Sequence, residues 1–84
     1  MAWVYILECA DGSFYTGSTV DLEARVDAHQ SGLGANYTHD RRPVRLVWES
    51  EYEDVEDAFL WEKRIQGWSR AKKLALIEGR YASL

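Results

Sequence analysis

The hydrophobic and polar positions near the N-terminus predict a β-hairpin followed by a short helix. Residues 3–9 (WVYILEC) and 14–19 (FYTGST) are rich in β-branched and aromatic side chains, which favour strands. Asp11-Gly12 lies between them, and such a pair is typical of tight hairpin turns because glycine adopts a positive φ without strain. Residues 21–30 (DLEARVDAHQ) then predict a helix that ends at a Ser-Gly pair.

A third strand is predicted where apolar and polar side chains alternate again. Residues 33–40 (LGANYTHD) have no such periodicity and predict a loop. In residues 44–52, the side chains of Val44, Leu46 and Trp48 are expected on one face, because successive strand residues point to opposite faces. Pairing with the hairpin would give a small antiparallel sheet.

Two helices are predicted in the C-terminal third. Residues 55–66 follow Asp54, which together with Asp57 resembles a capping box, and residues 70–78 follow Ser69 as a helix cap. The side chains expected to face the core are Val55, Ala58, Phe59 and Ile65 in the first helix and Leu74, Ala75 and Ile77 in the second, with Lys72 and Lys73 facing solvent.

The predicted order of elements, ββαβαα, indicates an α+β fold in which helices flank a three-stranded antiparallel sheet. The sequence has no repeat, linker or low-complexity tract, so we expect one domain spanning residues 1–84. Tyr52 and Tyr81 are expected to pack in this domain. The single cysteine cannot form an internal disulfide, and the N-terminal apolar run is too short to cross a bilayer. We therefore expect a cytoplasmic protein without membrane contact.

Several chemically versatile side chains are predicted to converge beside a glycine. Tyr5 and Tyr15 lie on the two hairpin strands, and Gly17 follows the second tyrosine, where a strand glycine often marks a close backbone approach. Arg25 and His29 are four residues apart and therefore share one helix face. This combination indicates a functional site, although the arginine could simply pair with Asp21 one turn earlier and the histidine could be a surface residue.

Glu62 is the candidate carboxylate for this site. It lies three residues after Phe59 and seven after Val55, so it borders the apolar stripe of its helix. An ordinary helical glutamate paired with a nearby basic residue would show the same pattern. A divalent ion at the site would need such a carboxylate, since Mg²⁺ is held by oxygen ligands and retains much of its water.

These residues occur in an order and spacing that resemble the GIY-YIG nuclease superfamily. The tripeptides VYI (residues 4–6) and YTG (residues 15–17) are followed by Arg25, His29 and, on a later helix, Glu62. The resemblance spans nearly the whole chain and is closest to the small single-domain bacterial and archaeal branch. One departure is that valine replaces the first glycine of the first tripeptide.

The resemblance implies a metal-dependent endonuclease that hydrolyses phosphodiester bonds in DNA. It implies that one motif tyrosine is the general base, that Arg25 contacts the scissile phosphate and that Glu62 holds one Mg²⁺ or Mn²⁺. We assign the base to Tyr5 and its hydrogen-bonding partner to Tyr15, with the reverse assignment left open. A phenol is a weak base at neutral pH, so a nearby cation such as Arg25, the metal or His29 would have to lower its pKa. Because one carboxylate makes a weak site, the ion is expected to bind mainly with substrate.

The geometry that follows from this assignment is a single concave surface. The hydroxyls of the two tyrosines and the carboxylate of the glutamate would converge around a space for a phosphate. The residues expected to line it are Tyr5, Tyr15, Arg25, His29 and Glu62.

The charge distribution is uneven, with a formal net charge of −4. Residues 49–57 contain six acids, and the rest of the chain is +2. This acidic segment would repel a duplex and is a candidate surface for a partner protein. Phosphate contacts are expected to weaken with rising salt. The basic residues expected to make them are Arg41, Arg42, Lys63, Arg64, Lys72 and Lys73.

Two alternatives remain open at this stage. Each charged run could be no more than a solvated face. The chain could also be a nucleic-acid-binding or protein-interaction module that retains the nuclease fold without efficient turnover. The sequence does not specify the structure of the DNA substrate, a choice between DNA and RNA, or the oligomeric state.

Overall fold

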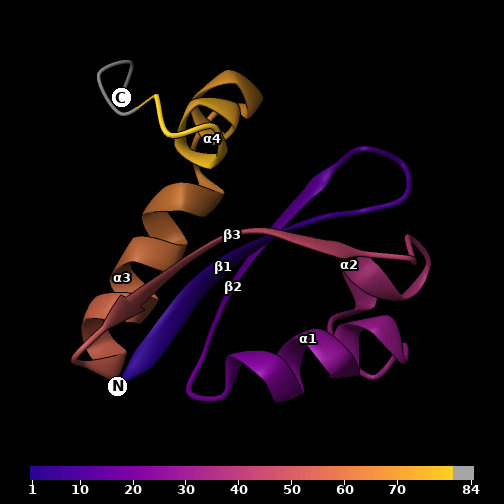
Figure 1. Ribbon diagram of the computed structural model, residues 1–84, viewed down its shortest axis with the longest axis horizontal. Coiled ribbons are helices and arrows are strands. Elements are labelled where there is room, and N and C mark those ends of the chain that lie inside the picture. Colours follow the sequence, from indigo (N-terminus) through magenta and orange to yellow (C-terminus); the bar gives the residue numbers. More distant parts are fainter. Residues whose placement is uncertain (81–84) are drawn as a thin grey trace.

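The three strands form an antiparallel sheet with the N-terminal strand in its centre, in the computed structural model, which describes residues 1–80 (Figure 1). The strands are β1 (Ala2–Glu8), β2 (Phe14–Thr19) and β3 (Arg45–Tyr52), in the order β2-β1-β3. Residues 4–7 of β1 are fully buried because neighbouring strands and helices surround them. The predicted α+β fold is confirmed, and the prediction for Tyr81 lies outside the described residues.

The hairpin between β1 and β2 closes as the sequence predicts. Gly12 has a φ of 83°, and the Asp11 carboxylate accepts hydrogen bonds from the backbone N–H and the hydroxyl of Ser13. The resulting register pairs Tyr5 with Gly17. Because side chains alternate between faces, this register also places Tyr15, two residues before Gly17, on the face of the sheet that carries Tyr5.

A β-bulge divides the apolar residues of β3 between the two faces of the sheet. Ile6 pairs with Trp48, whereas the next residue, Leu7, pairs with Leu46, so Val47 is an extra residue in β3. Leu46 packs on one face together with Val44, and Trp48 packs on the other. The prediction that Val44, Leu46 and Trp48 share a face is therefore wrong for Trp48, because one inserted residue reverses the alternation.

Helices cover both faces of the sheet, and each pair of helices encloses its own core (Figure 1). Helices α1 (Leu22–Gln30) and α2 (Asn36–His39) lie on one side, where the core includes Tyr5 and Leu7. Helices α3 (Val55–Gln66) and α4 (Arg70–Ile77) lie on the other side, where Val4 and Ile6 are buried. Helix α2 occupies a segment that was predicted to be a loop, and its four residues are too few to produce a visible periodicity.

The helix termini follow the predictions in part. Asp21 caps α1 by accepting a hydrogen bond from the Ala24 backbone, and Gly32, with a φ of 81°, follows the end of this helix. Ser69 caps α4 as predicted. Asp54 precedes α3 but makes no side-chain cap hydrogen bond, so the capping box predicted there is wrong.

Helix α3 contacts the sheet through a narrower stripe than the sequence predicts. Ala58, Glu62 and Ile65 are buried at spacings of four and three residues. Val55 and Phe59 are 57% and 51% exposed, so their assignment to the core is wrong. The buried stripe is centred on Ala58, Glu62 and Ile65, and with 3.6 residues per turn Val55 and Phe59 lie to one side of it.

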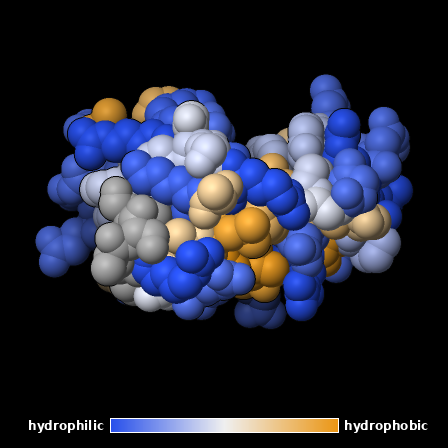
Figure 2. Space-filling model, turned by 90° about the horizontal axis from the view of Figure 1, so that it is seen from above, coloured by the Kyte–Doolittle hydropathy of each residue, from blue (hydrophilic) through white to orange (hydrophobic). Residues whose placement is uncertain are grey.

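The outer surface is largely hydrophilic in the view from above, with its most apolar area near the middle (Figure 2). Within the described part of the chain, no helix is both long and apolar enough to span a membrane.

Candidate active site at the edge of the sheet

Tyr5, His29 and Thr38 form a buried chain of hydrogen bonds on the α1 side of the sheet. The Tyr5 hydroxyl lies 2.8 Å from Nε2 of His29, and Nδ1 of His29 lies 2.8 Å from the Thr38 hydroxyl. Thr38 donates its single hydroxyl proton to the Ala35 carbonyl, so it accepts from His29. A neutral His29 therefore carries its proton on Nδ1, and its bare Nε2 accepts the proton of Tyr5.

Two glycines make room for this chain of hydrogen bonds. A methyl group at Gly17 would overlap the Tyr5 hydroxyl, and one at Gly34 would overlap the His29 ring. The close backbone approach expected at Gly17 is thus present, and it brings the Tyr5 hydroxyl against the edge strand β2. The absence of two side chains allows the phenol and the imidazole to reach each other.

Tyr15 extends the site toward the surface. Its ring centroid lies 5.1 Å from that of His29 and 6.4 Å from that of Tyr5. On its outer side Tyr15 stacks with Tyr37 of α2, at a centroid distance of 6.0 Å. Tyr15 is half-buried, so its hydroxyl has better access to solvent than that of the fully buried Tyr5.

Burial sets the protonation states of the three rings. It raises the pKa of Tyr5 to about 12, with a further rise from Tyr15 and an opposing effect of the Arg25 guanidinium. Burial likewise raises the pKa of Tyr15, to which the Glu62 charge adds. Burial, together with the Arg25 charge, lowers the pKa of His29. At neutral pH the site therefore holds two neutral phenols and a neutral imidazole.

Arg25 is the exposed member of the group. It lies one turn before His29 on α1, close enough for its guanidinium to act on the pKa of both His29 and Tyr5. The ion pair with Asp21 that the sequence left open does not form, and no carboxylate of the described residues pairs with this guanidinium. Its charge is available to an anionic ligand.

Glu62 approaches the site from the opposite side of the sheet. Its carboxylate accepts hydrogen bonds from the Ser18 hydroxyl and, at 2.8 Å, from the Gln66 amide, and the Lys63 ammonium is 3.6 Å away. Ser18 follows Gly17 on β2, so the carboxylate and the Tyr5 hydroxyl lie at neighbouring residues of this edge strand but on different faces. The Glu62 charge nevertheless contributes to the pKa of both tyrosines. The structure thus places Tyr5, Tyr15, Arg25 and His29 on the α1 side of β2, whereas Glu62 lies on the opposite face of the same edge strand.

Glu62 fits a metal ion that keeps most of its water. Among residues 1–80 it is the only buried carboxylate, and this part of the chain contains no cluster of three or more metal-binding side chains. Each carboxylate oxygen has one hydrogen-bond donor, which leaves lone pairs for an ion. Such a single carboxylate suits Mg²⁺ or Mn²⁺ held together with substrate oxygens.

Comparison with known proteins identifies the fold family. Residues 1–75 match the family model described as the GIY-YIG catalytic domain. The chain belongs to this family. Its relatives include the UPF0213 protein of Staphylococcus aureus (strain Mu3 / ATCC 700698), which is 49% identical over 78 residues covering 93% of this chain and 95% of the relative. The UPF0213 protein SA0446 of strain N315 has the same identity and coverage.

A solved structure agrees with this assignment. The solution NMR structure of the UPF0213 protein BH0048 from Bacillus halodurans has a TM-score of 0.60 and 47% identity, covering 93% of this chain and 84% of that one. The resemblance inferred from the motifs is thereby confirmed. GIY-YIG domains are generally endonucleases, so membership indicates nuclease activity, whereas the name UPF0213 specifies none.

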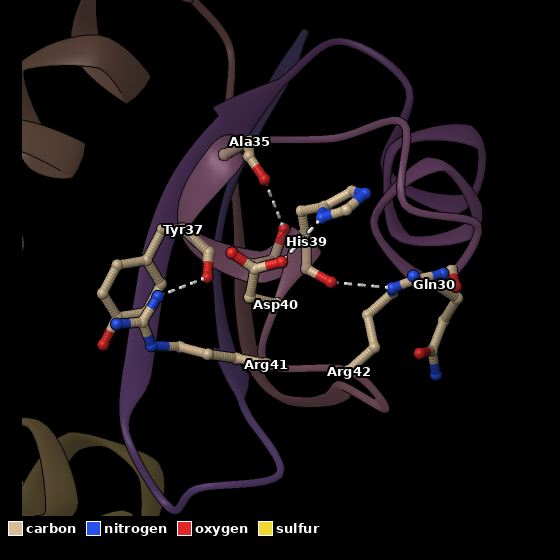
Figure 3. Close-up of polar contacts among 8 residues, drawn as sticks. Gln30, Ala35, Tyr37, His39, Asp40, Arg41 and Arg42 are labelled. Carbon is tan, nitrogen blue, oxygen red and sulfur yellow. Dashed lines mark hydrogen bonds and ion pairs between the residues drawn. The ribbon is translucent and has the colours of Figure 1, made fainter.

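The basic residues of this GIY-YIG domain do not form the single face that DNA contacts would suggest. Arg41 lies 4.0 Å above the Tyr37 ring and donates to the Tyr37 carbonyl, and Arg42 donates to the carbonyls of His39 and Gln30 (Figure 3). Both arginines thus stabilise the segment around α2.

The other four basic residues lie on the α3 and α4 side. Lys72 and Lys73 are half-buried, so the prediction that both face solvent is wrong: packing of the short α4 draws their aliphatic stems inward. Lys73 lines a groove beside β2, which is described below. The remaining three cations each lie over an aromatic ring: Lys63 over Phe59, Arg64 over Trp61 and Lys72 over Trp68.

Sequence reasoning missed several residues that shape the site. Ser18 and Gln66 could have been found, because one follows Gly17 on the edge strand and the other lies one helical turn after Glu62. Thr38, Gly34 and Tyr37 gave no signal, because they lie in a segment without periodicity and only the folded chain brings them to His29 and Tyr15.

Proposed function

We propose that the protein is a metal-dependent DNA endonuclease. The observation that supports this most directly is the hydrogen bond from the Tyr5 hydroxyl to the bare Nε2 of a buried, neutral His29. A tyrosine that already donates its proton to a base is prepared to accept one from water. Phosphodiester hydrolysis requires such a proton acceptor beside the attacking water.

The raised pKa of Tyr5 determines how the proton moves. An ionised Tyr5 is unfavourable at neutral pH, because burial raises the pKa of this phenol to about 12. A concerted relay avoids it: once substrate binding gives a water access to the buried Tyr5 hydroxyl, the water transfers its proton to the Tyr5 oxygen while Tyr5 transfers its own proton to Nε2 of His29. Tyr5 is then the immediate base and His29 the final acceptor, and the Nδ1–H bond to Thr38 orients the imidazole.

The remaining residues stabilise charge. Arg25 is the exposed guanidinium beside Tyr5 and would contact the non-bridging oxygens of the scissile phosphate. Tyr15, with better access to solvent, would hydrogen-bond the same phosphate or the water. Glu62 would hold one Mg²⁺ or Mn²⁺. When bound, this ion would polarise the phosphate and stabilise the leaving oxygen, effects worth several kcal/mol.

A cleavage assay tests this function. Pure protein is incubated with labelled duplex, nicked, branched and single-stranded DNA, each with Mg²⁺, with Mn²⁺ or with EDTA. We expect metal-dependent cleavage of at least one substrate, with its loss in Glu62→Gln and its retention in Glu56→Gln, an exposed acid on the same helix. Absence of cleavage in every combination would contradict the proposal.

A second candidate function is supported by the outer surface of α3. Val55 and Phe59 lie one helical turn apart on α3 and are 57% and 51% exposed, and the acidic residues 49–57 adjoin them. An apolar patch beside an acidic segment suits a basic protein surface with an apolar centre. If no substrate is cut, this interaction function becomes the better account. Phe59→Glu should then abolish binding of a basic amphipathic helical peptide, followed by tryptophan fluorescence.

A further inference from the structure

Thr16 has a buried hydroxyl without a partner. The residue is 3% exposed on β2, and its Oγ1 is the one buried side-chain polar atom in the described range that has no hydrogen bond. Leaving such a group unpaired costs stability, and buried polar groups are almost always satisfied. An unsatisfied hydroxyl at the edge of a functional site therefore points to a ligand.

Lys73 lies beside the same strand and also lacks a counter-charge. Its stem is half-buried, burial lowers the pKa of its ammonium, and no carboxylate in residues 1–80 forms an ion pair with it. The neighbouring Lys72 differs, because its ammonium lies 4.3 Å from the centre of the Trp68 ring. The two consecutive lysines thus have separate environments, and Lys73 is the one directed to the edge of the sheet.

Both groups line one groove of about 240 Å³ along β2. Tyr15 forms part of its wall, so the groove continues into the candidate active site. Gln66 also lines it and donates to both the Thr16 carbonyl and the Glu62 carboxylate, which connects the groove to the candidate metal ligand. The lining contains a cation, a free hydroxyl and an amide but no acid. The full set of lining residues is Phe14, Tyr15, Thr16, Tyr37, Gln66 and Lys73.

We propose that this groove is a phosphate subsite, in which Lys73 and the Thr16 hydroxyl bind a phosphate of the substrate strand other than the one being cut. The proposal rests on the proposed nuclease function, because the groove adjoins the site where Arg25 would bind the scissile phosphate. A strand running along the edge of β2 would present successive phosphates to the two sites. The aromatic rings of Phe14 and Tyr37 on the groove walls offer contact surface to the sugar or base between them.

Binding of inorganic phosphate tests the charge of the subsite. Phosphate is titrated into ¹⁵N-labelled protein at constant ionic strength, and the amide shifts of residues 14–18 are followed. We expect saturable shifts that Lys73→Met weakens about tenfold, as loss of one charged hydrogen-bonding group does. Arg45→Met removes an equal charge from β3, at the other edge of the sheet, and should leave them unchanged. An equal loss in both variants would overturn the proposal, since it would reflect overall charge.

Removal of the Thr16 hydroxyl gives a test in which stability and phosphate affinity should change in opposite directions. Thr16→Val keeps the shape of the side chain but removes the unpaired hydroxyl, so the free protein should become more stable in urea while its phosphate affinity falls about threefold to tenfold. Unchanged or lower stability together with unchanged affinity would show that the hydroxyl serves no ligand. Lower stability with lower affinity would assign it a structural role and equally contradict the proposal.

Cleavage kinetics separate the failure of the subsite from that of the proposed function. In a protein that cuts DNA, Lys73→Met and Thr16→Val should raise KM more than they lower kcat. If cleavage persists with KM unchanged, the nuclease function stands and the subsite fails. If the wild type cuts nothing but Lys73→Met alone loses phosphate binding, the subsite stands and the nuclease function fails.

Discussion

The Tyr5 hydroxyl donates its proton to Nε2 of His29 across 2.8 Å, in the buried space between β1 and α1. The direction of this hydrogen bond follows from the other ring nitrogen: because Nδ1 donates its proton to Thr38, Nε2 carries none and accepts from Tyr5. In the proposed reaction, this relationship makes Tyr5 the base and His29 its proton acceptor.

Removal of the Tyr5 hydroxyl should abolish most of the activity while the fold survives. We expect Tyr5→Phe to lower kcat by about 10² to 10⁴, the usual contribution of a general base. It should also cost about 1–3 kcal/mol of unfolding free energy, because Nε2 of His29 is left buried without a donor. Single-turnover cleavage and urea denaturation measure the two effects. Tyr52→Phe, in a half-buried tyrosine packed on the opposite side of the sheet, should keep full activity.

The pH dependence should report His29. Because burial lowers the pKa of His29, the folded protein keeps this ring neutral below pH 6.5, where an unfolded chain begins to protonate it. Unfolding then takes up a proton, so stability is complete above about pH 6.5 and is lost as the pH falls through the lowered pKa of the folded state. Cleavage should fall over the same range, because a protonated Nε2 accepts no proton.

An NMR titration of the His29 ring, with His39→Gln to remove the other histidine, would locate this transition. A His29 ring that titrates at or above 6.5 would contradict the burial argument.

Thr38 should act as a positioning residue through the tautomer of His29. Thr38→Val removes the acceptor for Nδ1–H, so part of the His29 population should move its proton to Nε2, where it opposes the Tyr5 hydroxyl. We expect kcat to fall about tenfold to a hundredfold with little change in KM. Thr38→Ser restores a hydroxyl and should recover most of the activity. Imidazole ¹⁵N shifts distinguish the two tautomers, and an unchanged Nδ1–H population in Thr38→Val would refute this role.

Glu62 and Arg25 should respond alike in cleavage and differently in binding. Glu62→Ala and Arg25→Ala should each abolish metal-dependent cleavage. DNA affinity should persist or increase in Glu62→Ala, which removes a negative charge, and fall in Arg25→Ala, which removes an exposed phosphate contact.

The same two variants should differ in stability. Glu62→Ala leaves the Ser18 hydroxyl and the Gln66 amide without their acceptor, so it should cost about 1–3 kcal/mol, whereas Arg25→Ala should cost less than about 0.5 kcal/mol. Fluorescence anisotropy and denaturation separate the variants. A folded Glu62→Ala variant that cleaves at the wild-type rate would remove Glu62 from the reaction.

The sequence by itself determined the parts of this protein that depend on neighbours along the chain. The Asp11-Gly12 turn set the hairpin register, and that register placed Tyr5 against Gly17. The four-residue spacing of Arg25 and His29 placed both on one face of a single short helix, although only His29 is buried. Because turns, strand alternation and helical period are local, the fold class and the α1 side of the site could be predicted.

Tertiary structure decided what depends on contacts between distant segments. One extra residue, Val47, reversed the faces of β3, and packing alone brought Thr38 of α2 to His29. Glu62 entered the buried stripe of α3, where Ser18, 44 residues earlier, supplies a hydrogen bond that stabilises a carboxylate out of water. A polar side chain can be buried at low cost only if another group forms a hydrogen bond or ion pair with it. For Glu62, Thr16 and the lysines of α4, the folded chain alone decides whether such a group lies nearby.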